Sequence, residues 1–102
     1  MSNRLRGTGR TTNMLKLAAA YQTKNPFANI AIIGTYHQIS SFKMVFVQLG
    51  GDYKRVSWLI YNGHGKVADV YKNQGFKDNE IFVDHYVLEL EHDFNMRKKL
   101  GK

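Results

Sequence analysis

The chain has 102 residues, 15 of them basic and 8 acidic, which gives a formal net charge of +7, and it contains no cysteine. Disulfides and thiolate metal sites are therefore excluded, and a hydrophobic share of 43% argues against a disordered chain. We expect a single globular domain over residues 1–102 with a modest core. The charge favours polyanionic partners such as nucleic acid, bound weakly and without strong sequence preference, or it serves solubility alone.

The N-terminus shows no apolar signal core, and no apolar run approaches the roughly 20 residues that span a bilayer. We therefore expect a soluble cytoplasmic protein with no membrane partner. The histidines show no metal-ligand pairing, so a zinc site is not expected; they are His37, His64, His85 and His92.

A glycine-punctuated stretch, Arg6–Thr12, leads into a helical pattern near the N-terminus. The phosphate-binding loop reads G-x-x-x-x-G-K-[ST], because its glycines let backbone N–H groups face the phosphates, its lysine reaches the terminal phosphates and its hydroxyl binds magnesium. Gly9-Arg10-Thr11 matches the closing triplet, with arginine in place of lysine. The alternative is a plain turn in which Thr11 caps the helix. Arginines at a helix N-terminus favour the phosphate interpretation, because the helix dipole opposes cations there unless an anion joins them.

The elements that follow are predicted from the spacing of apolar residues. Helical spacing predicts a helix over about 11–23, which ends at the loop containing the only proline. Ser40 or Ser41 is the expected cap of a second helix, which a Gly-Gly pair ends. A short helix that carries Val67, Val70 and Tyr71 and ends at Gly75, and a C-terminal helix over 86–100, complete the helical set. The C-terminal helix carries its acids early and its basic residues late, as the helix dipole favours.

Three short apolar runs predict strands near 29–35, 56–61 and 80–84, and near-continuous apolar runs are typical of parallel strands buried on both faces. Strands that alternate with helices imply an α/β fold with three layers, a mainly parallel sheet of about three strands and flanking helices. Because ligands bind at the carboxyl ends of such strands, we expect Thr35, Asn62 and Asp84 near one edge of the sheet.

The third apolar run, Ile81-Phe82-Val83, ends in Asp84. This is the form of the Walker B element, whose carboxylate holds magnesium at the end of a strand. An aspartate that merely caps a turn produces the same local pattern. The functional interpretation is favoured because this run follows the Gly-x-Gly-Arg-Thr-Thr element with a strand and two helical patterns between them.

Together, Gly7-Thr8-Gly9-Arg10-Thr11-Thr12 and the later segment Gly75–His85 resemble small bacteriophage-encoded P-loop proteins related to the ATPase cores of terminases and helicases. The resemblance covers roughly residues 4–89 and implies a truncated P-loop NTPase-like fold in the host-cell cytoplasm. It implies Mg²⁺ with ATP or another nucleotide, and metal contact by Thr11 and Asp84. The phosphate-contacting residues that it implies are Gly7, Thr8, Gly9, Arg10, Thr11 and Thr12.

The chain also departs from that pattern. No strand precedes the loop, Arg10 replaces the lysine, and His85 stands where many relatives have the acid that positions the attacking water. At most a weak or degenerate ATPase is therefore expected.

One hypothesis is a nucleotide-binding phage protein in a nucleic-acid process. The other is a non-enzymatic basic protein that binds nucleic acid or inhibits a host protein. Base stacking next to phosphate contacts needs aromatic residues interleaved with basic ones, and these are Tyr53, Trp58, Tyr61 and Tyr71 with Lys54, Arg55, Lys66 and Lys72.

Overall fold

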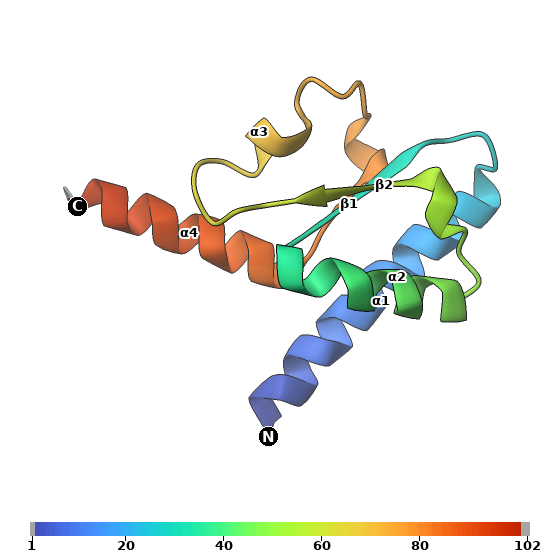
Figure 1. The fold of residues 1–102 in the computed structure, drawn as a ribbon, viewed down its shortest axis with the longest axis horizontal. Helices are drawn as coiled ribbons and strands as arrows, with labels where there is room; N and C mark the ends of the chain where they lie inside the picture. Colours follow the sequence, from blue (N-terminus) through green and yellow to red (C-terminus); the bar gives the residue numbers. More distant parts are fainter. Residues whose placement is uncertain (1, 101–102) are drawn as a thin grey trace.

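A computed structural model describes the backbone of residues 2–100 and the side chains of residues 9–100. Helices and strands alternate along the chain (Figure 1). The elements are α1 (Ser2–Lys24), β1 (Ile30–Gly34), α2 (Tyr36–Gln48), the 3₁₀ turn η1 (Tyr53–Arg55), β2 (Val56–Ile60), α3 (Ala68–Tyr71), the 3₁₀ turn η2 (Asp78–Glu80), β3 (Ile81–Val83) and α4 (His85–Lys99). None of the helices within residues 2–100 combines the length and apolar character needed to cross a membrane.

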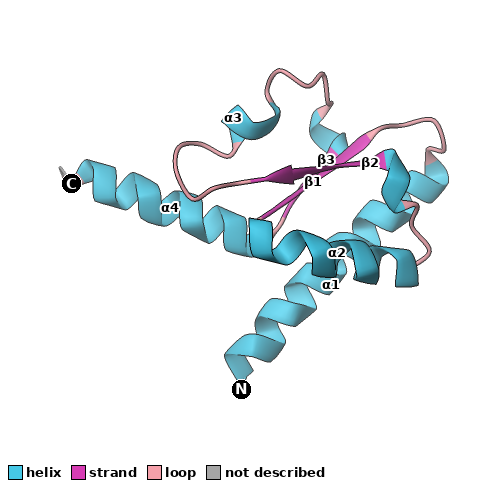
Figure 2. Ribbon diagram, in the orientation of Figure 1, coloured by secondary structure: helices cyan, strands magenta, loops and turns pink. Residues whose placement is uncertain are grey.

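The strands form one sheet in the order β2-β1-β3, and both strand pairs are parallel (Figure 2). In the centre, Ile32 of β1 lies opposite Trp58 of β2 and Phe82 of β3. Every residue of β1 is buried. The parallel sheet and the positions of its strands are thus confirmed. The strand sequences are apolar because helices cover both faces of the sheet.

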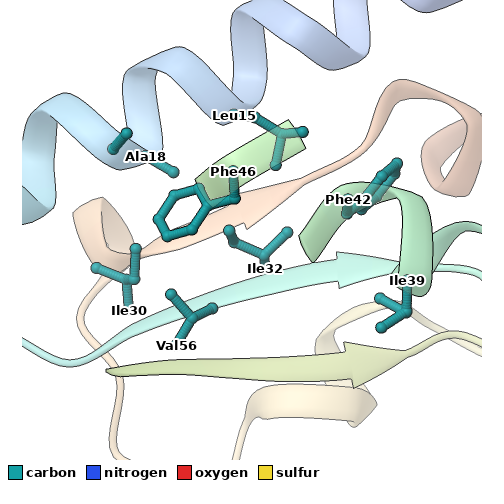
Figure 3. Packing of buried hydrophobic residues seen from close by; sticks show 9 residues of the cluster. Leu15, Ala18, Ile30, Ile32, Ile39, Phe42, Phe46 and Val56 are labelled. Atoms are coloured by element: carbon teal, nitrogen blue, oxygen red, sulfur yellow. The ribbon is translucent and has the colours of Figure 1, made fainter. Parts of the chain in front are cut away.

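The first helical layer is α1 with α2, which packs on one face of the sheet (Figure 3). Leu15 of α1 and Phe46 of α2 are completely buried, and the Phe46 ring meets Trp58 edge-on with centroids 5.6 Å apart. The other buried members of this cluster are Ala18, Ala19, Ile30, Ile32, Ile39, Phe42 and Val56.

The second layer covers the opposite face. Successive strand residues point to opposite sides, so Ile33 packs away from the first layer, against Val67, Tyr61 and, from α4, Val87. The buried Tyr61 hydroxyl donates to the Gly65 carbonyl oxygen at 2.7 Å, which ties down the loop after β2. Helices on both faces of a parallel sheet confirm the α/β class and the flanked-sheet arrangement.

The start of α2 differs from the prediction. This helix begins at Tyr36, whereas Ser40 and Ser41 are exposed residues of its second turn. Thr35 is the N-cap, and the Gln38 side-chain oxygen accepts from the Thr35 backbone N–H at 2.9 Å. A glutamine three residues after a threonine is the capping-box spacing, and it outweighs serines that have no such partner.

The start of α1 also differs. The stretch around Gly7 and Gly9, predicted to turn, is helical, because α1 begins at Ser2 and not near Thr11. The first four amide N–H groups of a helix have no partner within it. Every later N–H donates to the carbonyl oxygen four residues earlier. A phosphate loop is held bent between a buried strand and a helix, whereas the residues before Gly7 are themselves helical here. The amides of this stretch are therefore occupied in the observed conformation.

Gly34, the last residue of β1, allows the close approach of α2. A Cβ placed on Gly34 would lie 2.6 Å from Cε2 of the buried Phe42 ring. We expect Gly34→Ala to lower the free energy of unfolding by about 1–3 kcal/mol, the usual effect of overpacking a core. Urea denaturation followed by circular dichroism measures this change. A variant as stable as the wild type would contradict the tight contact between β1 and α2.

Candidate functional site

The candidate site lies at the carboxyl ends of β1 and β3. Asp84 follows β3 directly, and its backbone N–H donates to the Ile33 carbonyl oxygen of β1 at 3.1 Å. It is also the N-cap of α4, where its side chain accepts from the Tyr86 backbone N–H at 3.0 Å. Only 1% of Asp84 is exposed. Sheet and helix together therefore hold this carboxylate in one orientation.

Thr11 of α1 reaches Asp84 from the other end of the sequence. Its hydroxyl Oγ1 donates to Asp84 Oδ1 at 2.8 Å, across 73 residues of chain. Thr11 and Asp84 are the two residues for which metal contact was predicted. The structure brings them together, because α1 packs on one face of the sheet and its part-buried threonine meets the strand-terminal acid.

Gln38 joins the two strand ends and was not predicted as a site residue. Its side-chain Nε2 donates to Asp84 Oδ2 at 3.2 Å, while its Oε1 accepts from the Thr35 hydroxyl at 3.1 Å. The one available signal is the Thr35-x-x-Gln38 capping spacing, which places a glutamine in the first turn of α2. The amide orientation follows from these contacts, since only the nitrogen can donate to the carboxylate.

The Asp84 carboxylate accepts three hydrogen bonds. It accepts from the Thr11 hydroxyl, the Gln38 amide and the Tyr86 backbone, and the positive end of the α4 dipole faces it. Within residues 9–100, the ion pairs are Lys72 with Asp69 and His85 with Glu89, so Asp84 has no cationic side-chain partner there. Buried charges in proteins are usually paired or bound to a metal. Oδ2 accepts two of these hydrogen bonds and Oδ1 accepts one, so Oδ1 keeps a lone pair that could bind a cation.

A cation at this site would have few protein ligands. The described residues contain no cluster of three or more histidine, cysteine, aspartate or glutamate side chains that could hold a metal. Mg²⁺ suits such a site, because it keeps several waters and commonly binds through one or two protein groups plus substrate phosphates. Thr11 and Asp84 fit that minimal set.

The residues predicted to contact phosphate lie along the N-terminal part of α1. Gly9 and Arg10 are exposed and Thr12 is part-buried. The surroundings of Gly7 and Thr8 lie outside the described side chains, and their backbone belongs to α1. Figure 1 shows these first turns of α1 extending beyond the sheet. Phosphate contact by these residues stays a prediction, and in this helical conformation it does not involve their amides.

Two other polar residues near this edge, His85 and Asn62, make their contacts within their own segments. The His85 Nε2 lies 2.8 Å from Glu89 Oε2, one turn along α4. Asn62, expected near Thr35 and Asp84, accepts from the His64 backbone N–H at 2.9 Å within the loop after β2. The network of Thr11, Asp84, Gln38 and Thr35 is therefore the connected part of the predicted edge.

The predicted base-stacking aromatics do not form one surface. Tyr61 is 2% exposed, and Trp58 and Tyr71 pack against the two core clusters. Trp58 also donates from its indole nitrogen to the Tyr53 carbonyl oxygen at 2.8 Å. Only Tyr53 of the four predicted aromatics is exposed.

Comparison of the chain with protein-family models, curated proteins and solved structures finds no match.

Proposed function

We propose that this protein binds a phosphate-bearing ligand, ATP or another nucleotide, together with Mg²⁺, at the edge where α1 meets the ends of β1 and β3. The observation that carries the proposal is the hydrogen bond between Thr11 and the buried Asp84. The same two residues were predicted from sequence as the metal contacts, and ligands bind at this edge of parallel sheets.

Magnesium would be held by the Thr11 oxygen and by Asp84, directly or through water. A threonine hydroxyl that donates its proton to a carboxylate still has lone pairs for a metal. Gln38 and the Tyr86 backbone hold the other carboxylate oxygen. These contacts fix the side chain before a ligand arrives, which lowers the entropy lost on binding.

Phosphate contact through backbone amides requires the first turns of α1 to unwind. Gly7 and Gly9 lower the free energy needed for unwinding, because each glycine in a helix interior is about 1 kcal/mol less favourable than alanine. A new helix start near Thr11 would place free amides and the positive dipole end beside Asp84 and a bound metal. Arg10 would then reach the same phosphate with its guanidinium group.

Binding without fast hydrolysis fits this site best. The residue after the metal-binding acid is His85, whose imidazole is paired with Glu89 along α4. Fast nucleotide hydrolysis needs a group that positions the attacking water and a cation that stabilises the transition state.

A calorimetric titration with ATP and ADP, with and without Mg²⁺, tests the proposed nucleotide binding. Magnesium-dependent heat of binding supports it, and no binding at millimolar nucleotide contradicts it.

Gly9→Ala separates the unwinding step from the rest of the site. A Cβ on Gly9 meets nothing within 4 Å, so alanine fits the helix. We expect the variant to be more stable by about 1 kcal/mol and to bind nucleotide about fivefold more weakly, because the added helix stability opposes unwinding. Thermal unfolding and calorimetry measure the two changes. Higher stability with unchanged affinity would show that α1 stays helical when ligand binds.

A further inference from the structure

An apolar hollow lies on the outer side of α2, where the end of this helix approaches η1. It is an open concavity of about 370 Å³ and is lined by Lys43, Met44, Val47, Gln48 and Tyr53. Met44 is 66% exposed, Val47 50% and Tyr53 41%. We refer to this set of five residues as the α2 hollow.

The α2 hollow is not needed by the core of the protein. The opposite side of α2 supplies Phe42 and Phe46 to the core under the sheet. Single exposed apolar side chains are ordinary on protein surfaces. Here Met44, Val47 and Tyr53 come together around one concave space, and grouped apolar exposure of this kind marks interaction sites.

Basic residues outnumber acidic ones in the two segments that form the α2 hollow. The sequence has no acidic residue between Gly34 and Gly51, and Lys43 lines the hollow itself. Lys54 and Arg55 follow Tyr53 and are exposed. The nearest acid in sequence, Asp52, accepts from the Lys54 backbone N–H at 3.2 Å as the cap of η1. A hollow with Lys43 in its apolar lining, and with Lys54 and Arg55 directly after its Tyr53, is complementary to an acidic partner.

We propose that the α2 hollow binds an acidic segment of a partner protein. An apolar side chain of that segment enters the hollow, and neighbouring carboxylates face Lys43, Lys54 and Arg55. Amphipathic segments bind apolar grooves in this way, and methionine, tyrosine and arginine are enriched at protein interfaces. The surface is formed by α2 and η1, so it does not depend on the proposed nucleotide site.

The lining favours a protein over single-stranded nucleic acid. Nucleic acid that binds without base readout stacks successive bases on several aromatic side chains along a charged groove. The α2 hollow offers one exposed aromatic, Tyr53, next to the aliphatic side chains of Met44 and Val47.

Selection from a random-peptide display library tests the chemistry of the partner. The full-length wild type is the target, and Met44→Glu, which places a carboxylate in the hollow, is the counter-target. We expect enriched peptides with acidic residues around a large apolar side chain. The proposal would be overturned if no enriched peptide bound the wild type in preference to Met44→Glu, or if the enriched peptides lacked acidic residues.

Fluorescence anisotropy of a labelled selected peptide then locates its site. We expect Met44→Glu and Val47→Glu each to weaken binding by about tenfold or more, as for central interface residues, and Arg55→Glu to weaken it more at low salt than at high salt. Leu17→Glu is the matched control for Met44→Glu and Val47→Glu, since Leu17 of α1 is 65% exposed and the change in charge is the same as in those two variants. Unchanged melting temperatures show that each variant is folded.

Two outcomes of this measurement would overturn the proposal. One is equal weakening by Leu17→Glu and Met44→Glu, which indicates a general charge effect. The other is displacement of the peptide by labelled oligothymidylate that itself loses affinity in Met44→Glu, which assigns the hollow to nucleic acid.

Discussion

Asp84→Ala is expected to lower the free energy of unfolding by about 2–5 kcal/mol, a large share of the stability of a domain of this size. The variant removes the N-cap of α4 and leaves the Thr11 hydroxyl, the Gln38 amide and the Tyr86 N–H without their acceptor. Urea denaturation monitored by circular dichroism measures the loss. Wild-type stability would contradict the central role of this carboxylate in joining α1, α2 and β3.

Asp84→Asn is the matched variant, because asparagine keeps the shape and is also a good N-cap. Its amide oxygen accepts from Gln38 and the Tyr86 backbone, and its amide nitrogen donates to the Thr11 oxygen, which is able to accept. We expect the stability to stay within about 1 kcal/mol of wild type while magnesium no longer strengthens nucleotide binding. Magnesium-dependent binding that survives in Asp84→Asn would contradict the metal role of Asp84.

Arg10→Ala is expected to weaken nucleotide binding about ten- to hundredfold, because hydrogen bonds to a charged group contribute roughly 1.5–3 kcal/mol. Arg10 is exposed on α1, so the free energy of unfolding should change by no more than about 0.5 kcal/mol. Calorimetric titration with ATP and Mg²⁺ measures the affinity.

The control for Arg10→Ala is Lys16→Ala, which removes an exposed cation from the same helix farther along the chain. Both variants change the net charge equally, so a general electrostatic effect would weaken both to a similar extent. Equal affinities of Lys16→Ala and Arg10→Ala, or wild-type affinity of Arg10→Ala, would contradict phosphate contact by the Arg10 guanidinium.

The strands were predictable because burial on both faces leaves a clear signal. The central run Ile30–Gly34 is wholly apolar, and the structure buries all of it. Helix starts were less predictable, because they depend on single side-chain contacts. The hydrogen bonds that Gln38 makes with Thr35 decide where α2 begins, and serines at positions 40 and 41 are equally good caps when read alone.

The candidate site was predictable only where a motif carried it. Thr11 and Asp84 come from the resemblance to P-loop proteins, and their contact depends on how α1 crosses the sheet. Gln38 was missed because a capping glutamine looks the same whether or not its amide also reaches a buried acid. The exposure of Met44 and Val47 could not be predicted, since which apolar residues of a helix stay outside depends on tertiary packing and not on periodicity.

A two-dimensional amide NMR titration of the wild-type protein with ATP, in the presence and absence of Mg²⁺, tests the proposed nucleotide site most directly. We predict that the largest magnesium-dependent shift changes fall on residues 9–12 and on Thr35, Gln38 and Asp84, and that these changes are lost in Asp84→Asn. No shift changes at millimolar ATP, or changes centred away from the ends of β1 and β3, would contradict a nucleotide site at Thr11 and Asp84.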